Sequence, residues 1–231
     1  MRKTSLDKYG KKYVIASVFL VIVQMGIVFA SAGNTGLPRA WIFAAVNLIY
    51  SMLAILVFYK INPNLLNQRG KNHENAVKWD VILVKINNLN MIFLLPLIVG
   101  LDLRFDFLPL NELWQIPGYL LFIFSNVLVL GSMIANNHFE AHVRIQSERA
   151  HVVVKSWPYN LVRHPGYFGV ILWLFAFPLI IGSFAGIIFS AFISSGFIIR
   201  TRLEDNFLSK NLKGYSDYKK EVHDRIFPGI W

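Results

Sequence analysis

The sequence of 231 residues contains no cysteine and few charged residues. Without cysteine the chain cannot form a disulfide, a thiolate metal site or a cysteine nucleophile. Charged residues make up 16% of the chain, against about 25% in an average soluble domain. Because 55% of the residues are hydrophobic, the composition excludes an ordinary soluble domain of this size and indicates a membrane protein.

Long apolar runs are what the sequence has in place of charge. Four runs are each near the ~20 residues that cross a bilayer core, and they cover residues 13–31, 40–59, 81–101 and 117–135. The first run lacks a small-residue cleavage site, so we expect it to be retained as a span. A fifth run, residues 166–199, is too long for one crossing and barely enough for two, and we expect a hairpin of two short helices of about 16 residues each. The sequence therefore predicts an all-α integral membrane protein with about six transmembrane helices.

The positions of the cations predict the sidedness of this membrane protein, whose net charge is +10. If the N-terminus is cytoplasmic and the chain alternates sides, 20 of the 23 lysine and arginine residues fall in cytoplasmic segments, Arg2 and Lys3 among them. Only Arg39 and Arg104 fall in outside loops, and Lys85 lies within the third run. Cytoplasmic loops carry such an excess. We expect six crossings with both termini in the cytoplasm, although a re-entrant hairpin would give the same sidedness.

Two charged clusters flank the last apolar run. "RHPGY" (163–167) stands at its start and "RTRLED" (200–205) at its end. Because a hairpin leaves one membrane face and returns to it, both clusters would lie together at the cytoplasmic boundary. We therefore expect one binding site that combines segments about 35 residues apart.

The residue types in this constellation suit a ligand that carries charges and hydroxyl groups. Pro165 fits the first turn of a helix, whose free N–H groups favour an anion, and Arg163 and His164 strengthen that preference. Arg200 and Glu204 have the i, i+4 spacing that shares a helix face. That face offers a guanidinium for a carboxylate or phosphate and a carboxylate for hydroxyls or amines.

The segment "HVVVKSWPYNLVRHPGYFG" (151–169), followed by "RTRLED", resembles the isoprenylcysteine carboxyl methyltransferase family. The family pattern has a histidine beside hydrophobic residues, a tyrosine, Arg-His-Pro-x-Tyr-x-Gly, a hydrophobic hairpin and Arg-x-x-x-Glu-Glu. The resemblance covers about residues 136–231. It implies methyl transfer from S-adenosylmethionine to a lipophilic acceptor, in most cases a carboxylate, that enters from the bilayer. Residues 1–135 would then form four helices, and 136–231 a cytoplasmic cofactor-binding and catalytic region with hairpin 166–199 and a tail.

The resemblance also implies roles for individual residues. Arg200 and Glu204 would be catalytic, with Arg200 holding the acceptor carboxylate. The cofactor would contact Gln146, His151, Val152, Val153, Val154, Tyr159, Arg163, His164, Pro165, Gly166, Tyr167, Glu204 and Asp205. Three positions depart from the pattern: Gln146 is differently spaced, Trp157 replaces a glycine, and Asp205 replaces a second glutamate. No metal is implied, and an ionised carboxylate needs no general base, so catalysis would rest on positioning and exclusion of water.

One other enzyme class shares parts of the pattern. Membrane sterol reductases, which use NADPH, resemble the chain at Arg-His-Pro-x-Tyr-x-Gly and in the tail "GYSDYKKEVHDRIFPGIW" (214–231). A phospholipid amine methyltransferase is a further alternative. Its acceptor must lose a proton, and Glu204 is the candidate base.

Alternatives without catalysis rest on weaker signals. Lys85, Asn87, Asn88 and Asn90 place polar groups in the third run, as a transporter or scaffold would, but polar residues in spans also bond neighbouring helices. His138, His142 and His151 are only partly at helical spacing, and no acidic ligands complete a zinc site. We expect membrane lipids as partners, and neither a metal nor nucleic acid.

Overall fold

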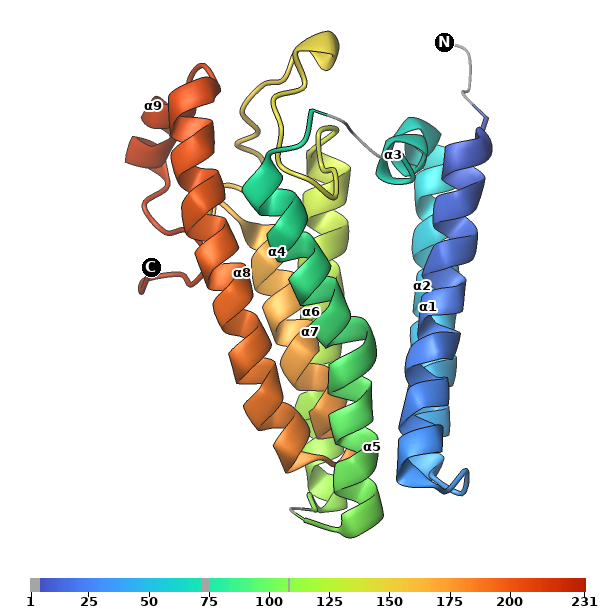
Figure 1. Cartoon of the computed structure of the whole chain (residues 1–231). Helices are drawn as coiled ribbons and strands as arrows, with labels where there is room; N and C mark the ends of the chain where they lie inside the picture. The colour runs from blue at the N-terminus through green and yellow to red at the C-terminus, as the bar shows by residue number, and fades with distance from the viewer. Residues whose placement is uncertain (1–4, 72–74, 108) are drawn as a thin grey trace.

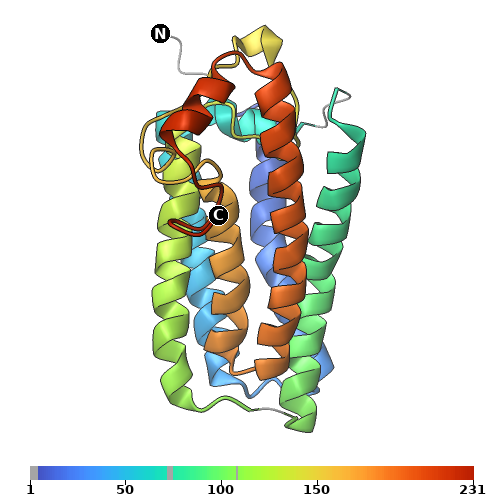
Figure 2. The ribbon, with the colours of Figure 1, turned by 90° about the vertical axis from the view of Figure 1, so that its left-hand side faces the viewer.

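The computed structural model describes residues 5–71, 75–107 and 109–231, so Arg2 and Lys3 lie outside the described residues. Within these ranges the protein is all-α, as predicted, and contains no strand. The long helices run roughly parallel to one axis, as Figures 1 and 2 show from two sides.

The first two long helices form a pair. Helix α1 (Lys8–Ala32) begins at Asp7, whose carboxylate accepts hydrogen bonds from the N–H groups of Tyr9 and Gly10, and ends at Gly33 in the left-handed conformation. Helix α2 (Pro38–Ile61) has proline at its first position, where a missing N–H costs nothing. The short helix α3 (Pro63–Arg69) begins in the same way and packs against α1.

The third apolar run forms one long helical rod with an irregular middle. It consists of α4 (Lys78–Leu89), the π-helical turn η1 (Asn90–Leu94) and α5 (Leu95–Phe105). Pro96 cannot donate a backbone hydrogen bond, and its ring would clash with a carbonyl one turn earlier. The wider π turn relieves that conflict, so the rod continues past the proline.

The remaining elements form the other half of the bundle. A short 3-10 turn, η2 (Glu112–Trp114), leads into α6 (Gln115–Ala135). A long connection, residues 136–164, contains several turns, one of them the 3-10 turn η3 (Ser147–Arg149), and no α-helix. Helices α7 (Pro165–Ile181), α8 (Phe184–Asn211) and α9 (Tyr215–Glu221) complete the fold.

Figure 1 places α1 and α2 on one side of the bundle and α6, α7 and α8 on the other. Helix α2 packs directly on α7, and the α4–α5 rod packs on α1 and α8. Close packing depends on small residues: a Cβ atom on Gly169 of α7 would lie 2.8 Å from the Ser125 carbonyl of α6, and one on Gly100 of α5 would lie 2.5 Å from the Val28 carbonyl of α1. We call the end of the bundle that carries α3, residues 136–164 and α9 the loop-rich end, and the opposite end the far end (Figure 2).

Five helices are long and apolar enough to cross a membrane: α1, α2, the α4–α5 rod, α6 with η2, and α8. Helix α7 has 17 residues, about 25 Å by helical rise. The prediction of two equally short helices in the last run is wrong for the second, because α8 has 28 residues. It continues beyond the apolar run to Asn211, and its polar extension packs against α9.

The turn between α7 and α8 is fixed at the far end. The Leu110 N–H donates to the Gly182 carbonyl (3.1 Å), and Asp102 accepts from the Ser183 hydroxyl (2.6 Å) and the Ala185 N–H (3.1 Å). Asp102 thereby caps the start of α8. The turn therefore lies beside residues 109–110, in the connection between α5 and α6.

Candidate functional site

The loop-rich end contains a cavity with about 840 Å³ of empty space, part of it open to solvent. The lining residues come from the 136–159 connection, the start of α7, the polar part of α8 and α9. Of the residues proposed from the sequence, it brings together Gln146, His151, Val152, Val153, Val154, Tyr159, Arg163, His164, Gly166, Tyr167, Arg200 and Glu204. Pro165 and Asp205 do not line it.

The start of α7 forms one wall of the cavity. His164 is the residue before the helix, Pro165 is its first residue, and Gly166 follows. A Cβ atom on Gly166 would lie 2.6 Å from the ring of Phe139, which also lines the cavity. Glycine is therefore needed here so that the 136–164 connection can close over the helix end.

Arg200, on α8, is held by a carboxylate that the sequence analysis did not identify. Its Nε donates to Asp80 Oδ1 (2.7 Å) and its Nη2 to Asp80 Oδ2 (3.3 Å), and Nη2 also donates to the Ala141 carbonyl (2.7 Å). The guanidinium lies over the ring of Tyr167 at 4.9 Å. Arg200 is thus buried and oriented before any ligand binds.

Glu204 lies one turn further along α8 and has a partner on α7. The hydroxyl of Tyr167 donates to Glu204 Oε2. The Tyr167 ring stacks on His164, with ring centres 5.7 Å apart and planes at 5°. The hairpin therefore brings the two charged clusters of the sequence into contact, as we expected from the apolar run between them.

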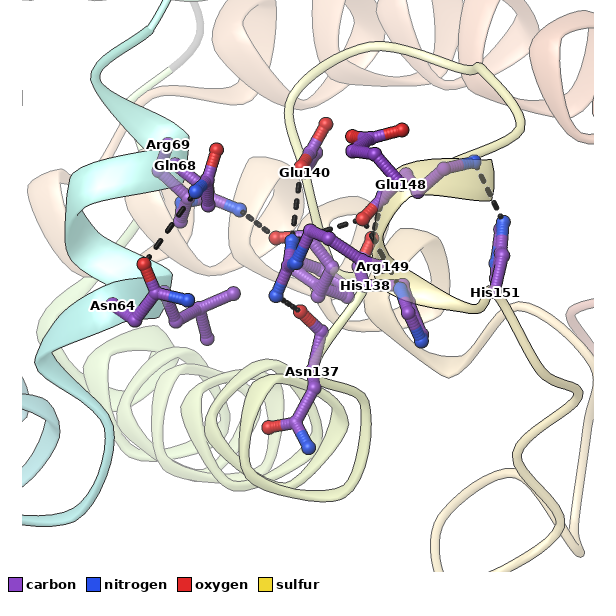
Figure 3. A network of polar contacts seen from close by, with 12 residues as sticks. Asn64, Gln68, Arg69, Asn137, His138, Glu140, Glu148, Arg149 and His151 are labelled. Carbon is purple, nitrogen blue, oxygen red and sulfur yellow. Dashed lines mark hydrogen bonds and ion pairs between the residues drawn. The ribbon is translucent and has the colours of Figure 1, made fainter. Parts of the chain in front are cut away.

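Another wall is the 136–151 part of the connection, whose polar contacts Figure 3 shows. Glu140 accepts from Arg144 Nε (2.8 Å) and from Arg149 Nη1 (3.1 Å), while Arg149 Nη2 donates to the Asn137 carbonyl (2.6 Å). The amide of Gln146 donates to the His138 carbonyl (2.8 Å). These bonds give an irregular segment a fixed shape beside the cavity.

His138 and His151 face each other inside that segment, with ring centres 4.5 Å apart. Burial lowers the pKa of His151 to about 4 and also lowers the pKa of His138. Both imidazoles are therefore neutral at pH 7, and each can donate and accept a hydrogen bond. Among the described residues no group of three histidine, aspartate or glutamate side chains is placed to hold a metal ion.

Tyr159 belongs to an apolar cluster with Leu212, Tyr215 and Tyr218, which closes the tail end of the cavity. The Tyr218 hydroxyl donates to the Tyr159 carbonyl at 2.6 Å. Burial raises the pKa of Tyr159 and of Tyr215, so both phenols are neutral hydrogen-bonding groups. Tyr215 and Tyr218 were not identified from the sequence as site residues, although the tail that carries them was.

Asp205, predicted to contact the cofactor, lies behind the cavity wall. Its carboxylate is fully buried and accepts hydrogen bonds from Arg163, Tyr215 and Arg225. Arg163 lines the cavity, yet its guanidinium also donates to the carbonyls of Val222 and His223, both at 2.7 Å. These two residues fasten the tail to the hairpin, and their charges neutralise each other.

Comparisons with known proteins give the same assignment as the motif. Residues 113–214 match the model of a family described as phospholipid methyltransferase. A rice protein named probable protein-S-isoprenylcysteine O-methyltransferase is 25% identical over 81% of this chain and 95% of its own length. A Dictyostelium discoideum protein named protein-S-isoprenylcysteine O-methyltransferase is 32% identical over 54% of this chain and 54% of its own length. A Saccharomyces cerevisiae protein of the same name is 26% identical over 75% of this chain and 73% of its own length. The chain is thus similar to methyltransferases of the isoprenylcysteine carboxyl type, the family that the motif resembles.

The protein is therefore a membrane methyltransferase, as the motif in residues 151–205 predicted. The similarity extends beyond residues 136–231, because the rice relative aligns with 81% of the chain. These relatives give no support to the reductase, transporter and scaffold alternatives. A methyltransferase must hold a methyl donor beside its acceptor, and the cavity at the loop-rich end combines residues of both predicted kinds.

Proposed function

We propose that this methyltransferase transfers the methyl group of S-adenosylmethionine to the carboxylate of a lipophilic acceptor. The observation that carries the proposal is that one cavity contains residues 151–154, the start of α7, and the Arg200 and Glu204 face of α8. These are the three segments for which the family resemblance implies donor and acceptor contacts.

The donor set in the cavity fits S-adenosylmethionine, which carries a carboxylate, an amine, ribose hydroxyls and an adenine ring. In the described part of the chain, the backbone groups of residues 151–155 make no hydrogen bond within the protein, so they are available to a ligand. Neutral His151 adds a donor and an acceptor. Gly166, in the first turn of α7, offers a free N–H and the positive end of the helix to the carboxylate.

Arg200 would hold the acceptor carboxylate through Nη1. Its Nε and Nη2 are bound to Asp80 and Ala141, and Nη1 has no partner in the ranges that the structure describes. When bound, the donor supplies a methyl group on a positively charged sulfur, and a carboxylate oxygen forms the C–O bond as the C–S bond breaks and leaves its electron pair on sulfur. No proton moves in this step, so the chain's contribution is orientation by Arg200 and shielding from water by the tyrosine-lined walls.

The acceptor's apolar part would enter from the bilayer, with the loop-rich end in the cytoplasm. Six helices would cross the membrane, with α7 and α8 reaching the same far face as the α5–α6 connection. The bond from Leu110 to Gly182 supports this topology, because a re-entrant hairpin would leave its turn short of that connection. Arg39 and Arg104 lie near the far-end residues Gly182 and Gly33, as the positive-inside rule requires of the few outside cations.

A phospholipid amine is a second candidate acceptor, and the Arg200–Asp80 pair favours it. That pair leaves little net positive charge for a carboxylate, while Glu204 adds a carboxylate to the cavity wall. An amine would lose its proton to Glu204, which the Tyr167 hydroxyl orients. The family description, phospholipid methyltransferase, is consistent with this acceptor.

The donor can be identified from thermal protection of the purified protein. S-adenosylhomocysteine, the demethylated donor, should raise the melting temperature in a concentration-dependent way. At 100 times its Kd it should add about 2.7 kcal/mol to the free energy of unfolding. NADPH at equal concentration should leave the melting temperature unchanged. Protection by NADPH alone would contradict the proposed donor.

The acceptor can be identified from the chemistry of the product. Methyl-labelled donor is incubated with the protein and either an S-farnesylcysteine analogue or phosphatidylethanolamine vesicles. A methyl ester releases labelled methanol in alkali, whereas an N-methyl group does not. Alkali-labile label in the farnesylcysteine reaction supports a carboxylate acceptor, and alkali-stable label in the vesicle reaction assigns an amine instead.

A further inference from the structure

Asp80 stands outside every segment for which the sequence or the family model suggests a role. It lies in the first turn of α4, before residues 113–214 that match the family. Its side chain is fully buried although it carries an acid at the edge of an apolar run. Burial of a charge is costly unless the charge is paired and hydrogen-bonded, so its partners indicate its purpose.

The partners of Asp80 all belong to the cavity wall. Besides the two bonds from Arg200, its Oδ2 accepts from the Val143 N–H at 2.8 Å and lies 3.3 Å from His142 Nδ1. His142, Val143 and Arg200 all line the cavity. One carboxylate from the first half of the chain therefore joins α4, α8 and the 136–164 connection at the site.

The bonds to Asp80 determine how Arg200 is presented. A guanidinium has five N–H donors in a rigid plane. Asp80 and Ala141 engage the Nε and Nη2 edge, and the Tyr167 ring lies against the guanidinium at 4.9 Å. With that edge and the plane fixed, the Nη1 donors point in a single direction relative to Glu204 and Tyr167.

We propose that Asp80 is a positioning residue for methyl transfer, which acts through Arg200 to fix the acceptor relative to the donor. This inference rests on the proposed function, because it assigns Arg200 to the acceptor. Asp80 itself touches neither substrate. A purely structural Asp80 would support folding and leave the kinetic constants of the folded protein unchanged.

The test compares Asp80→Asn with Asp102→Asn, a matched change to a buried carboxylate at the far end that caps α8. Rates are measured with the acceptor that the wild type uses, per mole of folded protein. Asp80→Asn should raise the acceptor KM or lower kcat by about 10- to 100-fold, the effect typical of losing a residue that orients another ligand-binding group. The Kd for S-adenosylhomocysteine should stay within about twofold, and Asp102→Asn should change neither kinetic constant beyond about twofold.

A double-mutant cycle tests whether Asp80 affects the kinetic constants through Arg200. In the Arg200→Gln background, Asp80→Asn should cause little further loss, because the group that it orients is already absent. If Asp80→Asn alone does not fold, two other variants replace it in the test. They are Asp80→Glu and the double variant Asp80→Asn with Arg200→Gln, in which both charges are removed. The double variant should then be as active as Arg200→Gln alone, and Asp80→Glu, which moves the charge by one methylene, should lose part of the activity.

Two failures can be distinguished. An active wild type whose Asp80→Asn kinetics equal those of Asp102→Asn, or whose losses add fully in the double variant, overturns the positioning role and leaves the proposed function intact. A wild type that binds S-adenosylhomocysteine but methylates neither acceptor overturns the proposed function, and the role of Asp80 falls with it.

Discussion

Arg163 and Asp205 form a buried ion pair across 42 residues of sequence, with Nε–Oδ1 at 2.8 Å and Nη2–Oδ2 at 3.2 Å. The Arg163 N–H donates to the Asp224 carbonyl (3.0 Å) and the His164 N–H to the Arg225 carbonyl (2.8 Å). The start of α7, the polar part of α8 and the tail are thus one unit. The cavity depends on that unit, because all three segments adjoin it.

Asp205→Asn should therefore destabilise the protein strongly. The substitution leaves the buried guanidinium of Arg163 without its charged partner, and breaking such a pair costs about 3–5 kcal/mol. Thermal unfolding in detergent micelles would measure the loss as a lowered melting temperature. Asp217→Asn, which removes an exposed carboxylate paired with Lys220, should leave the melting temperature nearly unchanged. Equal effects of the two variants would show that the Arg163–Asp205 pair does not hold the tail.

Gly166→Ala should weaken donor binding. The new methyl group would lie 2.6 Å from the Phe139 ring, so the ring must shift into the cavity that both residues line. Overpacking of this kind costs about 1–3 kcal/mol, and about tenfold in the Kd for S-adenosylhomocysteine corresponds to 1.4 kcal/mol. Titration calorimetry would measure the change. Gly26→Ala in α1, where a Cβ meets nothing within 4 Å, should bind as the wild type does, and a Gly166→Ala variant that does the same would contradict the described wall.

Stability should fall in acid partly because of His151. Its pKa is about 4 in the folded protein and 6.5 in an exposed histidine, so the unfolded chain binds the extra proton between these values. The contribution of the neutral imidazole is fully present above about pH 6.5 and is lost as the pH falls towards 4. The melting temperature of the wild type minus that of His151→Asn should therefore decrease as the pH is lowered from about 6.5 to 4.

The control for that experiment is Ser216→Ala, which changes an exposed residue of α9 and removes no titratable group. The difference in melting temperature between this control variant and the wild type should stay constant between pH 6.5 and 4. A flat difference for His151→Asn as well would contradict a buried, neutral His151.

The crossing of α7 and α8 can be tested with introduced cysteines, since the chain has none of its own. Phe184→Cys at the exposed start of α8 and Asn111→Cys in the α5–α6 connection should react with a membrane-impermeant maleimide from the same side. Ser216→Cys in α9 should react only from the opposite side. A Phe184→Cys variant that reacts from neither side, while Asn111→Cys does, would indicate a re-entrant hairpin.

The sequence predicts the parts of this fold that the membrane imposes. Apolar runs of about 20 residues reveal the long helices, and the turn at Gly182 and Ser183 makes Arg200 and Glu204 neighbours of Tyr167. The spacing of Arg200 and Glu204 predicts a helix just beyond the apolar run. Its continuation to Asn211 was not predicted, because the stability of that part comes from contacts with the tail and not from apolar periodicity.

Long-range pairing explains the residues that sequence reasoning missed. Asp80 meets Arg200 across 120 residues, and the only local signal is a single acid at the start of an apolar run. Asp205 follows Glu204 directly, yet consecutive residues on a helix face different directions, so Glu204 lines the cavity and Asp205 faces Arg163 and the tail. The distinction depends on the angle at which α8 packs, which the sequence pattern does not specify.

The most direct measurement is transfer of labelled methyl from S-adenosylmethionine to the acceptor by the purified wild type, Arg200→Gln and Arg39→Gln. Arg39 is a matched arginine at the far end, where it donates to the Leu110 carbonyl at 3.0 Å. We expect transfer by the wild type and Arg39→Gln, and at least a tenfold lower kcat/KM for Arg200→Gln, a loss of about 1.4 kcal/mol or more in transition-state binding. Equal activity of Arg200→Gln and wild type would contradict the account that the cavity at the loop-rich end is the methyl-transfer site.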